Sequence, residues 1–367
     1  MDQNRLALLA LHFIPGLGDY LIRQLISYCG SADKVFKYPK GKLLKVPGVG
    51  EVTAQSIRNA KTFHDAEKEI RKAEKEDTRL IFYIDKDYPS RLKQINDAPT
   101  LLYAKGEIDF ENKKMVGIVG TRKATEYGRR CVEELVSALT SHHACIVSGL
   151  AYGIDIHAHK QAIKHKLPTI GVMGSGIDVV YPPSHRETAR KMSDNGGILT
   201  EHPFGTNPDA HNFPARNRIV AGLSDAIVIV EAAAKGGALI TAEIANSYNK
   251  DVFAFPGNVG QATSEGCNNL IKTNKAFLLT SIKDLEYLMN WDAAAPPKKS
   301  KKQELEGLDA EELAVVHLLM ENKMQLPIDE LSWKSGIGVS QLASVLLNLE
   351  FKGMVTTSPG KVYRLKD

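Results

Sequence analysis

The sequence predicts a doubly wound, Rossmann-like α/β fold for the middle of the chain. From Met115 onward, short apolar and β-branched runs alternate with segments of helical length. The predicted strands are 115–119, 145–147, 169–173, 198–199, 226–230 and 252–255. Buried strands that alternate with helices are typical of a parallel sheet covered on both faces. We therefore expect residues 76–291 to form this domain.

Length and composition agree with a folded protein of more than one domain. The chain has 367 residues, of which 43% are hydrophobic and 25% are charged. At roughly 150 residues per domain this length suggests two or three domains, and the composition excludes a mostly disordered chain. Lys plus Arg number 47 against 43 Asp plus Glu, a formal net charge of +4. That excess is too small to identify a nucleic-acid-binding protein by itself.

Residues 1–75 predict a helical domain with a duplicated unit. The pattern apolar-Pro-Gly-apolar-Gly occurs at 14–18 and again at 46–50, and apolar residues at helical spacing follow each copy. Each Pro-Gly hairpin is expected to join two short helices, as in helix-hairpin-helix or SAM-like domains. Such a hairpin can hold a phosphate through backbone N–H groups. Because Asp19 and Glu51 follow the hairpins directly and would repel a phosphate, packing or protein contact is the alternative role.

The composition changes after Trp291. Residues 292–306 contain an Ala-Pro run and a lysine-rich run with no apolar face, which predicts a linker. Residues 307–367 predict a winged helix. Its expected elements are helices at about 310–321, 328–334 and 340–352 and a β-pair around 358–360. The outer face of the third helix has one lysine against one glutamate, so we favour a structural or protein-contact role over groove reading.

Membrane and redox signals are weak. The apolar run at 6–13 is too short to span a membrane. The four cysteines, Cys29, Cys131, Cys145 and Cys267, form no CxxC pair. We expect a cytoplasmic protein without membrane contact, with single buried thiols and with no metal or other cofactor.

The loops that follow the predicted strands suit anion binding. In a doubly wound sheet, ligands bind at the carboxyl ends of the strands. The loops at 120–122, 148–155, 174–178 and 234–238 present glycine with small hydroxyl or basic residues, and glycine lets backbone N–H groups approach an anion. The chain contains neither GxxxxGK[ST] nor GxGxxG after its first strand. A P-loop and a dinucleotide cofactor are therefore disfavoured.

The segment 212–218, Asn-Phe-Pro-Ala-Arg-Asn-Arg, adds cations and a ring. Arg216 and Arg218 can donate to phosphates, and Asn217 can bond a base or a phosphate. Phe213 offers a flat face for stacking, unless it belongs to the core. The segment thus adds cations and an aromatic ring to the glycine-rich loops.

Arg122 and Tyr152 extend the same surface. If these loops converge, they form a basic groove with aromatic walls, which suits an extended single strand better than a duplex. Arg218 has an alternative role, because it could pair with Asp225 or Glu231 and hold the fold.

No catalytic constellation is evident. His157 and His159 lie two residues apart and so point to different faces of a helix. Ser148 lacks the surroundings of a GxSxG nucleophile. Asp155 opens a helix and is expected to cap it or to hold the loop. We therefore predict a binding protein and not an enzyme.

Seven motifs in order closely resemble the DNA-processing protein A family, DprA or Smf. They are VGTR at 119–122, SGLAYGID at 148–155, GSGIDVVYP at 174–182, NFPARNRIVAGLS at 212–224, KGGALITA at 235–242, FPGN at 255–258 and GCNNLI at 266–271. The resemblance covers about 80–280. It implies a non-enzymatic protein that binds and protects single-stranded DNA in natural transformation, helps to load the RecA recombinase and forms a homodimer.

The resemblance also implies a DNA pocket. Carried over to this sequence, it comprises Gly120, Thr121, Arg122, Ser148, Gly149, Tyr152, Gly153, Phe213, Arg216, Asn217, Arg218, Lys235, Gly236 and Gly237. Some relatives have lysine where this chain has Tyr152 and Ala210. Affinity should therefore depend more on Arg122 and on stacking.

Two other functions stay open. KGGALITAEI at 235–244 partly resembles the PGGxGTxxE motif of phosphoribohydrolases, with Glu243 at the position of the acid. Leu239 and Ile240 replace the Gly-Thr that would hold a phosphate. The second alternative is a scaffold whose central pocket binds a nucleotide signal.

Overall fold

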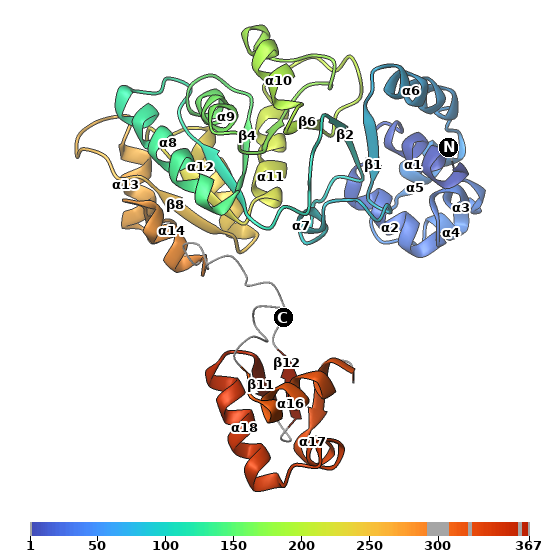
Figure 1. The fold of residues 1–367 in the computed structure, drawn as a ribbon. Coiled ribbons are helices and arrows are strands. Elements are labelled where there is room, and N and C mark those ends of the chain that lie inside the picture. The colour runs from blue at the N-terminus through green and yellow to red at the C-terminus, as the bar shows by residue number, and fades with distance from the viewer. Residues whose placement is uncertain (1, 292–307, 322–324, 359–361, 366–367) are drawn as a thin grey trace. The chain divides into compact units, whose positions relative to one another are not determined.

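The computed structural model describes residues 2–291, 308–321, 325–358 and 362–365 (Figure 1). Two compact units divide the chain, Met1–Ala293 and Ala294–Asp367. The predicted linker at 292–306 lies outside the described residues. The first unit contains both the N-terminal helices and the large sheet, so the predicted boundary near residue 75 falls inside one compact body.

The N-terminal helices form around the two predicted hairpins. They are α1 (Gln3–His12), α2 (Asp19–Cys29), α3 (Ala32–Lys37), α4 (Lys40–Leu43), α5 (Glu51–Arg58) and α6 (Phe63–Lys75). The first hairpin joins α1 to α2 and the second joins α4 to α5, as predicted. Gly16 and Gly48 take φ values of +78° and +83°, which glycine adopts at little cost.

A nine-stranded sheet forms the centre of the first unit, with the order β1-β2-β6-β5-β4-β3-β7-β8-β9. Its strands are β1 (Arg79–Phe82), β2 (Leu101–Lys105), β3 (Met115–Val119), β4 (Cys145–Gly149), β5 (Thr169–Val172), β6 (Gly196–Thr200), β7 (Ala226–Ile229), β8 (Asp251–Ala254) and β9 (Phe277–Leu278). The six strands expected from Met115 onward are confirmed. The sheet is not wholly parallel, because β1 and β2 add antiparallel strands at one edge. Antiparallel strands need no crossover helix, so the alternation that predicted the sheet carried no signal for β2.

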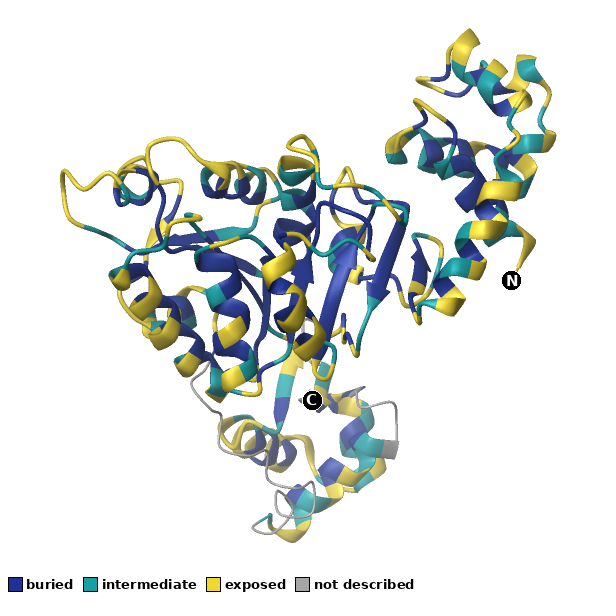
Figure 2. Ribbon diagram, turned by 90° about the horizontal axis from the view of Figure 1, so that it is seen from above, coloured by how far each residue is buried: buried dark blue, intermediate teal, exposed yellow. Residues whose placement is uncertain are grey.

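Helices cover both faces of the sheet. They are α7 (Ser90–Lys93), α8 (Glu126–Ala138), α9 (Ile154–Lys164), α10 (Arg186–Met192), α11 (Asn212–Leu223), α12 (Gly237–Ser247), α13 (Glu265–Lys272) and α14 (Ile282–Leu288), with 3-10 turns at Leu139–His142 and Pro183–His185. The core of one face includes α11, α12 and α13, and the core of the other includes α8, α9 and α14. Figure 2 shows the buried strands between the exposed outer surfaces of these helices. The doubly wound prediction is confirmed.

The topology creates a crevice beside β3. From β3 the chain moves outward through β4, β5 and β6 and then returns to β7, on the other side of β3. The loops after β3 and β7 therefore run to opposite sides of the sheet. Open α/β sheets bind ligands at such a switch point.

The second unit has the predicted winged-helix arrangement. Its elements are α16 (Ala310–Glu321), β10 (Gln325–Pro327), α17 (Ile328–Ser335), α18 (Val339–Phe351), β11 (Val355–Ser358) and β12 (Val362–Leu365), with the antiparallel order β10-β12-β11. The four expected core residues of α18, Leu342, Val345, Leu346 and Leu349, are buried. Lys352, the lysine expected on the outer face of this helix, binds the carboxylate of Glu312 at 2.6 Å.

All four cysteines are buried and free, as predicted. Among the described residues, no helix combines the length and apolar character needed to cross a membrane.

Arg218 joins the N-terminal helices to the sheet. This α11 side chain forms an ion pair with Glu201, which directly follows β6, and lies 3.6 Å from Asp19 at the start of α2. Asp19 also accepts hydrogen bonds from the backbone N–H (2.8 Å) and the hydroxyl (2.5 Å) of Thr100. Asp19, which was expected to repel a phosphate from the first hairpin, therefore links α2 to the sheet.

The partners considered for Arg218 from the sequence were wrong. Asp225 binds Arg91 at 2.7 Å, and Glu231 accepts a hydrogen bond from the hydroxyl of Thr125 at 2.6 Å. Glu201 comes from a different strand end, and Asp19 lies almost 200 residues away along the chain. Neither could be identified before the elements were packed.

Replacing Arg218 should destabilise the first unit. In Arg218→Ala, Glu201 and Asp19 lose a cation whose side chain is only 14% exposed. Removing one partner of a buried ion pair costs about 3–5 kcal/mol, and we expect a loss of that size in the free energy of unfolding, measured by urea denaturation.

The control is Arg71→Ala. Its partner Glu67 is 3.9 Å away and the Arg71 side chain is 80% exposed, so the expected change is below about 0.5 kcal/mol. An Arg218→Ala effect as small as the control would contradict a structural role for Arg218.

Candidate functional site

A cavity of about 700 Å³ opens at the switch point between β3 and β7. Three segments contribute most of its lining: the loop after β3, the first turns of α11 and the loop between β7 and α12. Nine of the predicted site residues line it: Gly120, Thr121, Arg122, Phe213, Arg216, Asn217, Lys235, Gly236 and Gly237. The structure thus brings together residues that are more than 100 positions apart in the sequence.

A cation and two rings meet at the edge of this cavity. The guanidinium carbon of the exposed Arg122 lies 5.4 Å from the centre of the Phe213 ring. The ring of Tyr181 packs against that of Phe213, with 6.0 Å between the ring centres and an interplanar angle of 36°. Phe213 is half-buried and does not belong to a closed core. The rings and the cation can therefore contact a ligand in the cavity.

Tyr181 was missed by the sequence analysis. It belongs to the GSGIDVVYP motif and is 44% exposed, but the motif was assigned no contact. An aromatic residue just after a glycine-rich strand end was the available signal.

Two buried charged side chains, Arg216 and Asp155, form the floor of the cavity. Arg216 is 5% exposed and donates hydrogen bonds to the carbonyl of Val172 and, at 3.1 Å, to Oδ1 of Asn217. Asp155 is 7% exposed. A Cβ atom on Gly149 would lie 2.4 Å from Oδ2 of Asp155 and 2.5 Å from Nη2 of Arg216. Both charged groups therefore lie over the same glycine.

Burial dominates the titration of these two groups. Burial raises the pKa of Asp155 to about 6, although the positive charges of Arg216 and Arg122 oppose the rise. Burial also lowers the pKa of Arg216, and Asp155 opposes that shift. The guanidinium of Arg216 thus donates hydrogen bonds within the protein, whereas the guanidinium of Arg122 is exposed to solvent.

The end of β4 supports the site from below its surface. Ser148 is fully buried and donates to the carbonyl of Ile118 at 2.5 Å. The buried His159 contacts the carbonyl of Gly149 at 2.6 Å. Gly153 has a φ of +81°, and a Cβ there would lie 2.2 Å from the carbonyl oxygen of Thr121. Only glycine fits so close to the loop that carries Arg122.

Tyr152 lies just beyond the main cavity. It is 50% exposed and its ring packs edge-on against His185 at 4.9 Å. A smaller hollow between Tyr152 and the main cavity is lined by Arg122, Tyr181 and Phe213 as well. Tyr152 is therefore continuous with the main site.

Arg218 does not share this site. Its guanidinium forms the ion pair with Glu201 and faces Asp19. Of the predicted site residues, Ser148, Gly149 and Arg218 line neither the switch-point cavity nor the smaller hollow beside it.

Glu243, the acid of the motif that partly resembles phosphoribohydrolases, forms an ion pair with a lysine. The exposed carboxylate of Glu243 accepts a hydrogen bond from Nζ of Lys275 at 2.6 Å. Within the described residues, no cluster of three or more His, Cys, Asp or Glu side chains could hold a metal ion.

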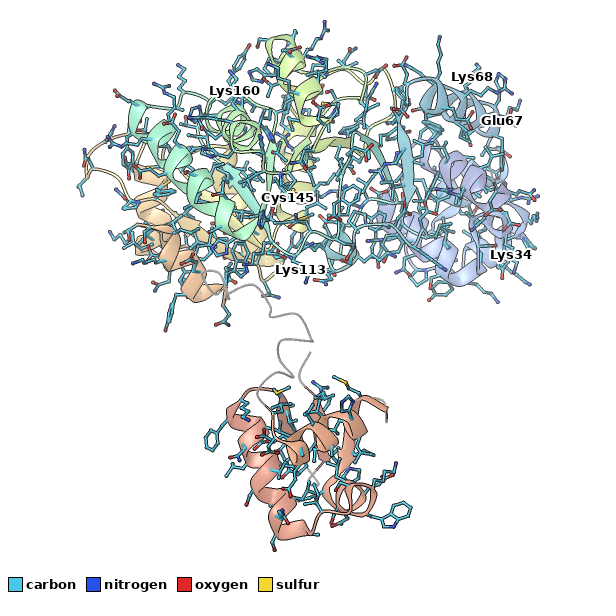
Figure 3. The ribbon with its side chains drawn as sticks, in the orientation of Figure 1. Lys34, Glu67, Lys68, Lys113, Cys145 and Lys160 are labelled. Carbon is cyan, nitrogen blue, oxygen red and sulfur yellow. The ribbon has the colours of Figure 1, made fainter. Side chains whose placement is uncertain are left out.

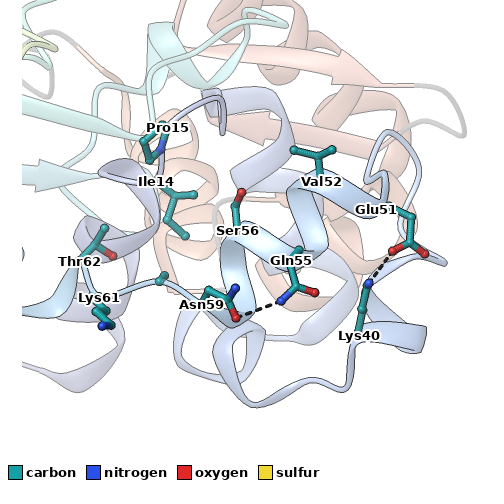
Figure 4. A pocket seen from close by; sticks show the side chains of 11 residues that line it. Ile14, Pro15, Lys40, Glu51, Val52, Gln55, Ser56, Asn59, Lys61 and Thr62 are labelled. Carbon is teal, nitrogen blue, oxygen red and sulfur yellow. Dashed lines mark hydrogen bonds and ion pairs between the residues drawn. The ribbon is translucent and has the colours of Figure 1, made fainter.

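A second cavity of about 680 Å³ lies among the N-terminal helices (Figure 4). Lys40 and Glu51 at its rim form an ion pair of 2.5 Å, and the amide of Gln55 donates to Asn59 at 3.0 Å. Because these polar groups satisfy one another, this cavity offers a ligand less than the switch-point cavity does. The glycine-rich strand ends border the switch-point cavity and not this second cavity.

Two known family models match this chain. The family described as DNA recombination-mediator protein A matches residues 79–290. The DprA winged helix domain matches residues 297–361.

Several curated relatives are similar over most of the chain. Protein Smf of Synechocystis is 36% identical over 276 residues, which are 74% of this chain and 69% of the relative. Protein Smf of Escherichia coli is 34% identical over 286 residues, 76% of this chain and 75% of the relative.

Two solved structures have a similar fold. The X-ray structure of DNA processing protein A from Streptococcus pneumoniae has a TM-score of 0.64 at 32% identity, covering 78% of this chain and 98% of that one. A structure of the Helicobacter pylori protein, described by its single-stranded DNA binding mode, has a TM-score of 0.53 at 29% identity and covers 59% of this chain and 96% of that one. Since the family match spans more than half of the sequence and includes the candidate site, the chain belongs to the DNA recombination-mediator protein A family.

Proposed function

We propose that this protein binds single-stranded DNA at the switch-point cavity, protects the strand during DNA uptake and recombination, and promotes RecA loading. One observation carries the proposal: the exposed Arg122 cation lies over the Phe213 ring, beside Tyr181, at the mouth of a cavity with glycine-rich walls. The single-stranded DNA binding described for the Helicobacter pylori relative supports the same ligand.

The chemistry of the cavity favours an unpaired strand. A ring can stack on a base only when that base is free of its partner strand, and each such stack contributes about 1–3 kcal/mol. Arg122 and Lys235 supply charge for phosphates, and the backbone at Gly236 and Gly237 is open to close approach. Among the proposed contacts, the buried Ser148 and Gly149 and the ion-paired Arg218 act by holding the surface that the others present.

The remaining parts of the proposal rest on the family. RecA loading, a role in natural transformation, a homodimer and a cytoplasmic location are what membership of the family suggests. Faster RecA filament formation on strands coated with this protein would support the loading role, and size measurement of the free protein would test the dimer. We assign no catalytic reaction to the cavity.

Arg122→Ala tests the DNA contact. We expect the wild-type chain to bind oligo-dT far more tightly than duplex DNA, with affinity that falls steeply as salt rises. The variant should lose roughly tenfold in affinity, and its salt slope should decrease by about 0.7, because one phosphate contact with a single strand is removed. Fluorescence anisotropy at several salt concentrations measures both quantities.

Arg71→Ala, on the exposed face of α6, is the charge-matched control and should bind like the wild type. Equal affinity for single-stranded and duplex DNA would contradict the proposed ligand. A folded Arg122→Ala variant with unchanged affinity would contradict the proposed site.

Asp155 should make binding depend on pH. Because its pKa is raised to about 6, the carboxyl group is neutral below that pH, and the cavity floor then carries one negative charge fewer. Affinity for oligo-dT should therefore increase as pH falls from about 7.5 to about 5 at constant ionic strength.

Asp155→Asn removes this titration, so its affinity should change less over the same pH interval. Circular dichroism would verify that the variant is folded. Parallel pH profiles for the two proteins would rule out Asp155 as the titrating group.

A further inference from the structure

We propose that the bound strand continues past Arg122 into a second, basic groove on the other side of Tyr152. This groove, about 420 Å³ in volume, lies beside the start of α8 and the first half of α9. Besides Arg122, which it shares with the main cavity, its basic side chains are Lys123, Arg129 and Lys160, and His157 also lines it. We call these residues the basic groove. The proposal rests on the proposed function and lengthens its site.

The positive charge of the basic groove is uncompensated. Lys123, Arg129 and Lys160 are exposed, and within the described part of the chain none of them forms an ion pair. The nearby acid, Glu133, contacts Nε2 of His157 at 3.1 Å. On α10, by contrast, Glu187 forms an ion pair with Arg190 at 2.9 Å.

The basic groove is continuous with the main cavity. Arg122 lines the main cavity, the smaller hollow and the basic groove. Tyr152 lines both the hollow and the basic groove, and Tyr181 and Phe213 line both the hollow and the main cavity. A chain of rings and cations therefore runs from Lys235 to Lys160 without a break.

The character of the lining changes along this path. The main cavity has stacking rings and glycine-rich backbone, whereas the basic groove has Arg122, three further cations and a single exposed ring at its rim. The main cavity thus suits bases together with phosphates, and the basic groove suits the phosphodiester backbone of the nucleotides that follow. The occupant we assign is the same DNA strand.

The test compares strands of two lengths. The triple variant Lys123→Gln, Arg129→Gln, Lys160→Gln removes the charge but keeps side chains of similar length. Affinity is measured for oligo-dT of about 6 nucleotides, near the short end of common site sizes, and of about 20 nucleotides, which exceeds them. We expect the triple variant to weaken the longer strand much more than the shorter one. Its salt slope for the longer strand should fall by about 2, as three lost phosphate contacts require at about 0.7 each.

The matched control removes the same charge elsewhere. Lys68, Lys272 and Lys283 are exposed lysines on α6, α13 and α14, and their triple glutamine variant should change both strands little. Figure 3 marks Lys160 on α9 and Lys68 on α6, well apart on the unit.

The outcomes separate the two proposals. Arg122→Ala should weaken both lengths, since Arg122 borders both parts of the path; unchanged binding of the short strand by that variant counts against the proposed function itself. If the triple variant matches its control, or weakens both lengths equally in a protein that circular dichroism shows to be folded, the basic groove is not an extension of the site and the inference is overturned.

Discussion

The buried charge of Arg218 is the constraint on which the arrangement of the first unit depends. A guanidinium group can be buried only with partners, because taking it out of water costs several kcal/mol. Glu201 at the end of β6 and Asp19 at the start of α2 are those partners. One side chain therefore fixes α11 against the sheet and against the N-terminal helices at the same time.

The position of α11 in turn determines the candidate site. Phe213, Arg216 and Asn217 occupy the first turns of the same helix, and all three line the cavity at the switch point. Arg216 points inward to the Val172 carbonyl and to the region of Asp155. The neighbouring loops supply the outward cation, Arg122. Arg218 thus holds the fold, Arg216 lies at the buried side of the cavity and Arg122 is exposed.

The small net charge of the chain is consistent with this division. A formal charge of +4 over 367 residues provides no general attraction for DNA. Local clustering does: Arg122, Lys123, Arg129 and Lys160 lie along one continuous path, while many other surface cations are paired with acids. Steering by such a cluster depends on ionic strength and does not need a basic protein overall.

The sequence by itself determined the elements of this protein. The alternation of strands and helices, the paired Pro-Gly hairpins, the core of α18 and the glycine-rich strand ends all follow from local pattern, and nine predicted site residues indeed meet in one cavity. Tyr181 and two further features were not identified from the sequence. The antiparallel β2 has no periodic signal, and Lys123, Arg129 and Lys160 look like any solvated helix surface when read in order.

Only the tertiary structure decided what each arginine does. Whether a guanidinium faces DNA or holds the fold depends on which acids packing brings within 4 Å, and those acids come from distant segments: Glu201 and Asp19 for Arg218. Burial likewise separated Ser148 and Gly149, which support the loop, from Tyr152, which is half exposed beside them. Local sequence specifies which residues can bind a phosphate, and long-range packing specifies which of them remain free to do so.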